Sequence, residues 1–93
     1  MSNRHEHEPA REIDLHGLRP EQALRRLEQE LHAARVRGER TLRVITGRGW
    51  GNRAQKPVLR GHVERWLANE GPTFGVLAAR VVAKGGALDV ELG

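Results

Sequence analysis

The chain has 93 residues, of which 30% are charged and 38% hydrophobic, and it contains no cysteine. This length and composition are typical of one folded, soluble domain and exclude a disordered chain. The lack of cysteine excludes a disulfide framework and zinc sites built on thiolates, and it fits a reducing compartment. No apolar run approaches the ~20 residues of a membrane helix, and residues 1–11 lack the apolar stretch of a secretory signal. We therefore expect a cytoplasmic protein with no membrane partner.

Sixteen basic residues against twelve acidic ones give a formal net charge of +4, and all the basic residues except Lys56 and Lys84 are arginine. Arginine presents a planar fork of donors that matches phosphate, so this bias favours a nucleic-acid partner. A GC-rich genome, which favours arginine codons, explains the bias equally well. The positions of the basic residues along the chain must therefore decide between these two explanations.

Residues 1–11 carry charges, histidines and one proline without apolar periodicity, which predicts a flexible tail. Residues 12–93 are predicted to form a single domain. The domain begins with a short strand at Glu12–Leu15, because Ile13 and Leu15 fall on one side of an extended segment.

The clearest predicted element is a helix over Pro20–Arg37. Proline suits the first position of a helix, and Gly38 is a natural stop at its C-terminus. Apolar residues follow a 3-4-3 spacing, which predicts an inner face made of Leu24, Leu27, Leu31 and Ala34.

The middle of the chain predicts a strand, a loop and a second helix. Thr41–Thr46 is rich in β-branched residues, as strands are. Gly47–Gln55 is a basic loop rich in glycine. Lys56–Glu70 follows as an amphipathic helix that ends before Gly71-Pro72. Its inner face is predicted to consist of Leu59, Val63, Trp66 and Leu67.

The end of the chain predicts a hairpin. Phe74–Ala83 is mostly apolar, which predicts a well-buried strand, and Lys84-Gly85-Gly86 predicts a tight turn. Ala87–Leu92 alternates apolar and acidic residues, as a half-exposed strand does. The order of elements is thus βαβαββ. Strands separated by helices tend to pair in parallel and hairpin strands pair antiparallel, so we predict an α/β fold with a four-stranded mixed sheet.

Two segments whose side chains are candidates for catalysis or binding each come directly after a predicted strand. Asp14-Leu15-His16-Gly17 ends the first strand, and Thr46-Gly47-Arg48-Gly49 ends the second. In open α/β sheets, ligands gather at the carboxyl ends of the strands. If the two strands are parallel neighbours, these segments form one site.

His16 is the natural candidate for proton transfer in this site, because imidazole gives or takes a proton near neutrality. Asp14 lies two residues earlier on the same strand face, where it can orient the ring or help to hold a metal ion. The alternative is structural: Asp14 accepts backbone N–H bonds at the turn, and His16 is packed and hydrogen-bonded. From the residues alone both interpretations stay open.

The loop after Thr41–Thr46 has the features of a phosphate-binding surface. Its glycines allow a ligand to approach the backbone closely, and it leads to a helix N-terminus, whose free N–H groups favour phosphate. Trp50 can stack on an unpaired base. Positive side chains gather here at Arg48, Arg53, Lys56 and Arg60. The alternative is a solvated basic loop with Trp50 folded back onto the core.

The two tetrapeptides carry a family resemblance. Asp14-Leu15-His16-Gly17, followed by a leucine-rich helix, resembles the opening DLHG motif of small MutS-related (Smr) domains. Thr46-Gly47-Arg48-Gly49 is similar to their second motif, HGxG, with threonine where many members have histidine. Gly85-Gly86-Ala87-Leu88 is similar to their closing glycine-rich hairpin. The resemblance covers about residues 12–92, with both motifs in the family's order.

The resemblance implies a two-layer α+β fold like the C-terminal domain of translation initiation factor three, with two helices on one face of the sheet. It also implies binding of DNA or RNA, often with endonuclease activity. Thr46 removes a second imidazole that many members have. From the resemblance as a whole we predict an endonuclease with His16 and Asp14 as catalytic residues. The predicted nucleic-acid-binding residues are Thr46, Gly47, Arg48, Gly49, Trp50, Arg53, Lys56 and Arg60.

Two other functions stay open at this point. One is a non-catalytic nucleic-acid-binding module that uses the same basic loop, and the other is a protein-interaction adaptor whose charges are incidental. The expected cofactor is either none or Mg²⁺, with Asp14 as the candidate ligand. The sequence leaves open the choice between DNA and RNA, and the oligomeric state, for which a monomer is one option.

Overall fold

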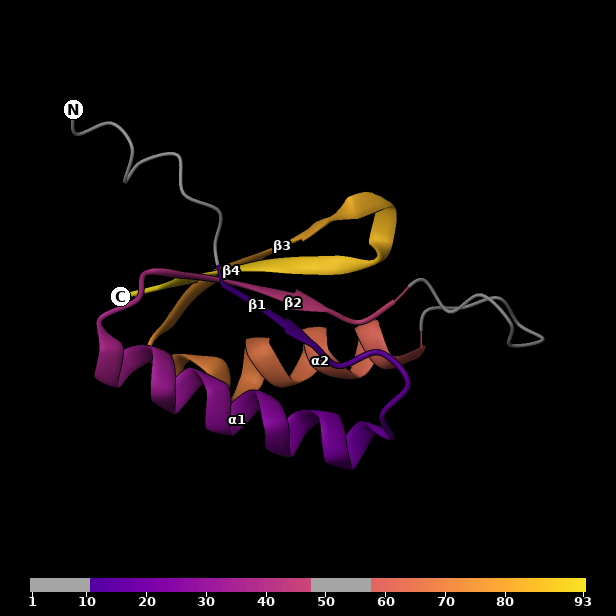
Figure 1. Cartoon of the computed structure of the whole chain (residues 1–93), viewed down its shortest axis with the longest axis horizontal. Coiled ribbons are helices and arrows are strands. Elements are labelled where there is room, and N and C mark those ends of the chain that lie inside the picture. The colour runs from indigo at the N-terminus through magenta and orange to yellow at the C-terminus, as the bar shows by residue number, and fades with distance from the viewer. Residues whose placement is uncertain (1–10, 48–57) are drawn as a thin grey trace.

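The structure is a computed structural model, which describes residues 11–47 and 58–93. The described chain follows the predicted βαβαββ order (Figure 1). Its strands and helices are β1 (Arg11–Asp14), α1 (Pro20–Arg37), β2 (Thr41–Ile45), α2 (Val58–Asn69), β3 (Val76–Val82) and β4 (Ala87–Leu92). Short 3₁₀ turns, Gly71–Phe74 and Ala83–Gly85, precede and follow β3.

The four strands form one mixed sheet in the order β1-β2-β4-β3. β1 and β2 are parallel neighbours, with Ile13 beside Val44. β4 is antiparallel to both β2 and β3, so the last strand of the chain lies inside the sheet. Both helices cover the same face, and the opposite face carries no helix of the described chain (Figure 1). The predicted two-layer fold with helices on one face is therefore confirmed.

Local signals set the ends of α1 where the sequence predicts them. Pro20 is the first helical residue, and the N–H of Arg19 just before it donates to the side-chain oxygen of Gln22 at 3.1 Å. Gly38 ends the helix with φ +74°, a conformation that costs other residues about 1–2 kcal/mol. The helix thus has bounds that the sequence alone can place.

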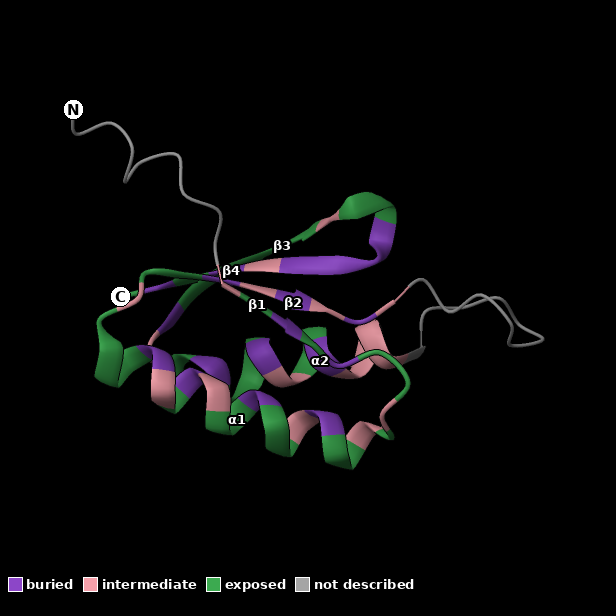
Figure 2. Ribbon diagram, in the orientation of Figure 1, coloured by how far each residue is buried: buried purple, intermediate pink, exposed green. Residues whose placement is uncertain are grey.

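The core lies between the helices and the sheet (Figure 2). α1 contributes Leu27 and Leu31, both with no exposed surface, whereas Leu24 is only half-buried against the core. On α2 the ring of Trp66 is also half-buried, and it stacks on Phe74 with 5.5 Å between the ring centroids. The predicted apolar faces of both helices therefore meet the sheet, with Leu24 and Trp66 at the margin.

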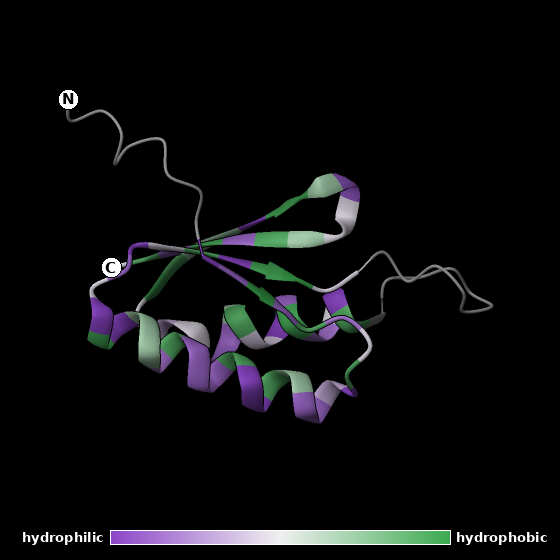
Figure 3. Ribbon diagram, in the orientation of Figure 1, coloured by the Kyte–Doolittle hydropathy of each residue, from purple (hydrophilic) through white to green (hydrophobic). Residues whose placement is uncertain are grey.

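The prediction that the strand within Phe74–Ala83 is well buried is wrong. β3 is buried only at Val76, and its next five residues are exposed. Figures 2 and 3 show a strand that is both exposed and largely hydrophobic. The physical reason is position, since β3 is an edge strand, and an apolar run does not reveal whether a strand lies inside a sheet or at its edge.

The first strand begins at Arg11, one residue inside the segment predicted as a flexible tail. The guanidinium of Arg11 pairs with Glu30 on α1 at 2.7 Å and with Glu39 at 3.1 Å, so this residue is part of the domain. Residues 1–10 lie outside the described chain. Within the described residues, no helix combines the length and apolar character that crossing a membrane requires.

Candidate active site

His16 and Asp14 form a hydrogen-bonded pair just beyond the end of β1. One oxygen of Asp14, Oδ1, accepts the backbone N–H of His16 at 3.0 Å and lies 2.5 Å from its ring nitrogen Nδ1. The turn that follows Asp14 folds the chain back so that both contacts are made, with Gly17 at φ +82°. The side chains of His16 and Asp14 are 67% and 53% exposed. The pair is therefore open to a large substrate.

This geometry defines what each ring nitrogen of His16 can do. Hydrogen bonds from the His16 ring and from its backbone N–H hold the pKa of the Asp14 carboxyl below its ordinary value. A carboxylate at Nδ1 favours the tautomer that carries its proton there, which leaves Nε2 as an acceptor that no described residue engages. The arrangement is thus that of a general base held in place by a carboxylate.

The end of β2 packs directly against this pair, as the sequence predicts for parallel neighbours. The N–H of Leu15 donates to the carbonyl of Ile45 at 2.7 Å, which continues the β1–β2 pairing one residue past the end of β1. Gly47 has φ +81°, and a methyl group at this position would lie 3.3 Å from Cβ of His16. The glycine loop therefore starts beside the histidine.

A third segment completes this end of the molecule, and sequence reasoning missed its role. The carbonyl of Gly86, in the turn between β3 and β4, accepts the N–H groups of both Thr46 and Gly47 at 3.0 Å. Ala83 and Lys84 in the same turn have φ +54° and +55°. Such backbone is uncommon for residues other than glycine and concentrates at functional sites. We call this region, Asp14–Gly17 with Thr46, Gly47 and Ala83–Gly86, the loop end.

Thr46 and Gly47 serve the loop end structurally. Thr46 is only 5% exposed, and its hydroxyl lies 3.3 Å from the carbonyl of Gly47. Because Gly86 already accepts the N–H groups of both residues, these two amides do not face a ligand. Both residues therefore shape the backbone of the loop end, and the predicted charge stabilisation by loop amides does not come from them.

Arg60 joins α2 to the loop end. Its Nη1 donates to the carbonyl of Gly85 at 3.4 Å, and its Nε lies 3.6 Å from the carboxylate of Glu64. Gly85 has φ +93°, and a methyl group there would approach Nη1 of Arg60 to 2.6 Å. The side chain of Arg60 is 28% exposed, so it braces the turn while part of it stays open to solvent.

The other predicted contacts lie outside the described residues, namely Arg48, Gly49, Trp50, Arg53 and Lys56. Lys84 is a cation that sequence reasoning did not assign to the site. It is exposed in the turn whose backbone holds the loop end together. The glycine pair that follows it marks a tight turn, but it does not show that this turn lies beside the end of β2.

The described residues do not assemble a metal site. No three histidine, aspartate or glutamate side chains among residues 11–47 and 58–93 come close enough to share an ion. Asp14 is the carboxylate of the loop end, and one of its two oxygens is engaged by His16. Mg²⁺ is usually held by one or two carboxylates together with substrate phosphates. Asp14 offers one such carboxylate through its second oxygen, but its observed partner is the His16 imidazole, so we assign Asp14 to the imidazole.

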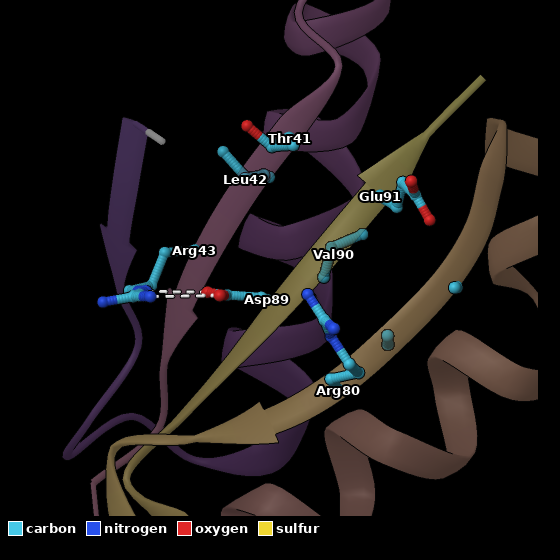
Figure 4. A pocket seen from close by; sticks show the side chains of 9 residues that line it. Thr41, Leu42, Arg43, Arg80, Asp89, Val90 and Glu91 are labelled. Carbon is cyan, nitrogen blue, oxygen red and sulfur yellow. Dashed lines mark hydrogen bonds and ion pairs between the residues drawn. The ribbon is translucent and has the colours of Figure 1, made fainter. Parts of the chain in front are cut away.

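The open face of the sheet differs in charge from the loop end. The strand register places Glu12, Arg43, Asp89 and Arg80 in one row across it, with signs that alternate. Arg43 and Asp89 form two hydrogen bonds, at 2.7 and 3.0 Å (Figure 4). This pairing holds the pKa of Asp89 below its ordinary value. A face of alternating charge attracts phosphate weakly, so the open face does not continue the basic surface predicted for the loop.

Comparison with known proteins agrees with this geometry. The family model of the Smr domain matches residues 13–92. The chain is similar to the crystal structure of the Smr domain of Thermus thermophilus MutS2, with 30% identity and a TM-score of 0.73 over 90% of this chain and 99% of that one. It is also similar to the solution structure of the B3BP Smr domain, with 29% identity, a TM-score of 0.62, and 88% and 77% of the two chains covered. No curated protein sequence matches.

Proposed function

This chain belongs to the Smr domain family, whose domains are of the nucleic-acid-binding and nuclease type, and we propose that it cleaves phosphodiester bonds in nucleic acid. The observation that carries the proposal is the His16–Asp14 pair, which is exposed, hydrogen-bonded and in contact with the start of a basic glycine loop. A purely structural histidine at a turn needs neither this exposure nor an Nε2 that the described residues leave without a partner.

The proposed reaction uses Nε2 of His16, the ring nitrogen that Asp14 does not contact. Nε2 of His16 accepts the proton of an attacking water, the water oxygen bonds to phosphorus, and the bond to the leaving oxygen breaks. The leaving oxygen takes a proton from solvent. Asp14 stabilises the imidazolium that forms and keeps the ring in position, so it is a positioning residue. Positive side chains around the loop end stabilise the added charge on phosphorus.

Binding is proposed to come from the loop end and the adjacent basic loop. Lys84 is exposed there, and Arg60 is partly exposed beside it. Arg48, Arg53 and Lys56 add charge in the segment between β2 and α2. Because the open sheet face alternates in sign, we expect the phosphate backbone to cross the loop end without lying over the sheet.

A non-catalytic nucleic-acid-binding module is the second candidate. The observation that favours it is Thr46, which is buried and offers no second imidazole to protonate the leaving oxygen. In that function His16 and Asp14 would shape the turn only. The two candidates differ in whether the charge of Asp14 matters once substrate is bound.

The test is a cleavage assay on DNA and on structured RNA, with and without Mg²⁺, using the unmodified chain, Asp14→Asn and Glu12→Gln. Asparagine still accepts the backbone N–H of His16, so the turn is kept while the charge beside the ring is lost. We expect Asp14→Asn to lower turnover at saturating substrate by about 10²-fold with little change in affinity. Glu12 is an exposed carboxylate on the same strand, and its variant should cleave at the parent rate. Binding without cleavage by the unmodified chain would favour the second candidate.

A further inference from the structure

The edge of the sheet formed by β3 has little protection beyond a bulge between Val76 and Ala78. β3 has seven residues and pairs only with β4 among the described residues, so its outer backbone groups have no strand to bond to. Its only charged residue is Arg80. The opposite edge strand, β1, has four residues, of which three are charged. Proteins normally keep edge strands short or charged because a long apolar edge recruits another strand.

The exposed apolar side chains gather on this same strand. Leu77 is 68% exposed and Val81 is 43% exposed, and these are two of the three large hydrophobic residues exposed in the described chain. A hollow lined by Leu67, Ala68 and Pro72 continues the apolar surface from β3 toward α2. β3 therefore presents both an unpaired backbone edge and an apolar side-chain surface.

We propose that this chain forms a symmetric dimer in which two β3 strands pair antiparallel edge to edge. The occupant is a second copy, because the strand is complementary to itself in one register. A twofold axis at Ala79 places Leu77, the residue at the bulge of β3, opposite Val81 of the other copy, twice per dimer. An axis at Arg80 would place the two arginines side by side, and an axis at Ala78 would leave Val81 without a partner on the facing strand.

Charge supports the same register. Glu91 on β4 lies beside Ala78 on β3, on the open face of the sheet. In the dimer, Ala78 lies opposite Arg80 of the other copy, so that arginine and Glu91 stand two strand spacings apart, about 10 Å between backbones. The small side chain of Ala78 leaves the space between them open. Neither Arg80 nor Glu91 forms an ion pair with another described residue of its own copy. Asp89, which lies beside Arg80 on β4, is paired with Arg43 instead (Figure 4).

The dimer leaves both loop ends free. The β3–β4 hairpin carries the loop end at its turn, whereas the pairing runs along the strand between Val76 and Val82. The twofold axis puts the two loop ends at opposite ends of a continuous eight-stranded sheet. The inference is therefore independent of whether the loop end cuts nucleic acid.

The first test is the mass of the purified chain by sedimentation equilibrium over a range of concentrations. We expect it to approach twice the 10.4 kDa of one chain. Val81→Lys or Leu77→Lys should raise the dimer dissociation constant about 10²-fold or more, because two unpaired charges would be buried in each dimer. The matched control is Val36→Lys, at the third exposed large hydrophobic residue on α1, which should leave the dimer unchanged.

A mixing experiment tests the register. Arg80→Glu and Glu91→Arg each place like charges together in their own homodimer, so each variant alone should be a monomer. Mixed in equal amounts, they restore an opposite-charge pair at both contacts and should form a heterodimer. Thermal unfolding of each variant checks that it is folded. A parent chain that stays monomeric at the highest concentration would overturn the proposal, as would a dimer that survives both lysine variants. A folded pair that fails to associate would overturn the register.

Discussion

Gly47 is the residue at which the backbone of one strand end meets the histidine of the other. Any side chain here must adopt φ +81° and press on Cβ of His16 at 3.3 Å. We expect Gly47→Ala to cost about 1–2 kcal/mol of stability from the backbone alone and, in addition, to reduce cleavage by moving His16.

The control for Gly47→Ala is Gly38→Ala. Gly38 has nearly the same backbone, φ +74°, with no atom within 4 Å of an added methyl group, and it lies at the other end of α1. Urea unfolding should show similar losses of stability in both variants, but only Gly47→Ala should lower the cleavage rate of the folded protein. Equal rates in the two variants would mean that the contact with His16 does not matter.

For single residues, the sequence predicts contacts between side chains that are close together in the chain. Asp14 and His16 are two residues apart, so their pairing and its place after a strand can be predicted from the sequence. The involvement of Lys84 and Gly86 could not be predicted in the same way. It depends on β4 lying inside the sheet beside β2, a contact between segments about forty residues apart whose geometry no local pattern encodes.

At the scale of elements, an ion-pair cluster ties β1 to α1. Hydrogen bonds from Arg11 hold the pKa of Glu30 below its ordinary value, with Arg26 adding to the effect. A carboxyl with a lowered pKa contributes stability above its unfolded pKa of about 4.3, and this stability is lost as the pH falls through the folded value. The cluster therefore stabilises the protein at neutral pH and less so in acid.

Arg11→Met tests this contribution. We expect a loss of about 1 kcal/mol at pH 7, since half-buried pairs lie at the upper end of the range for surface ion pairs. At a pH well below 4 the parent has lost the pairs as well, so the gap in melting temperature between parent and variant should narrow. Arg25→Met, at an exposed arginine on α1, should show no such dependence on pH. A gap that stays constant with pH would contradict an electrostatic role.

The elements also show why part of the fold could be predicted and part could not. α1 has proline at its start, glycine after its end and a regular apolar spacing, and its bounds are those predicted. β3 has only an apolar run, which a central strand and an edge strand share. Its exposure follows from the sheet order, and that order is a property of the whole chain.

At the scale of the whole molecule, basic charge is proposed to act at one end. Each phosphate that a cation neutralises releases counterions, so affinity for nucleic acid should fall steeply with salt. Lys84→Ala should lower the slope of log affinity against log salt by about one. Arg37→Ala, at the opposite end of the molecule near the C-terminus of α1, should leave the slope unchanged. Equal slopes for Lys84→Ala and the parent would place the binding surface away from the loop end.

At the loop end, one imidazole, that of His16, is proposed to move the proton in phosphodiester cleavage. The most direct measurement is the single-turnover cleavage rate of His16→Ala, with affinity measured on the same substrate. His62→Ala is the control, since His62 is a half-buried histidine on α2. We predict a fall of about 10²–10⁴-fold in the rate for His16→Ala, with affinity nearly unchanged and His62→Ala at the parent rate. Cleavage by His16→Ala at the parent rate would show that His16 does not move the proton.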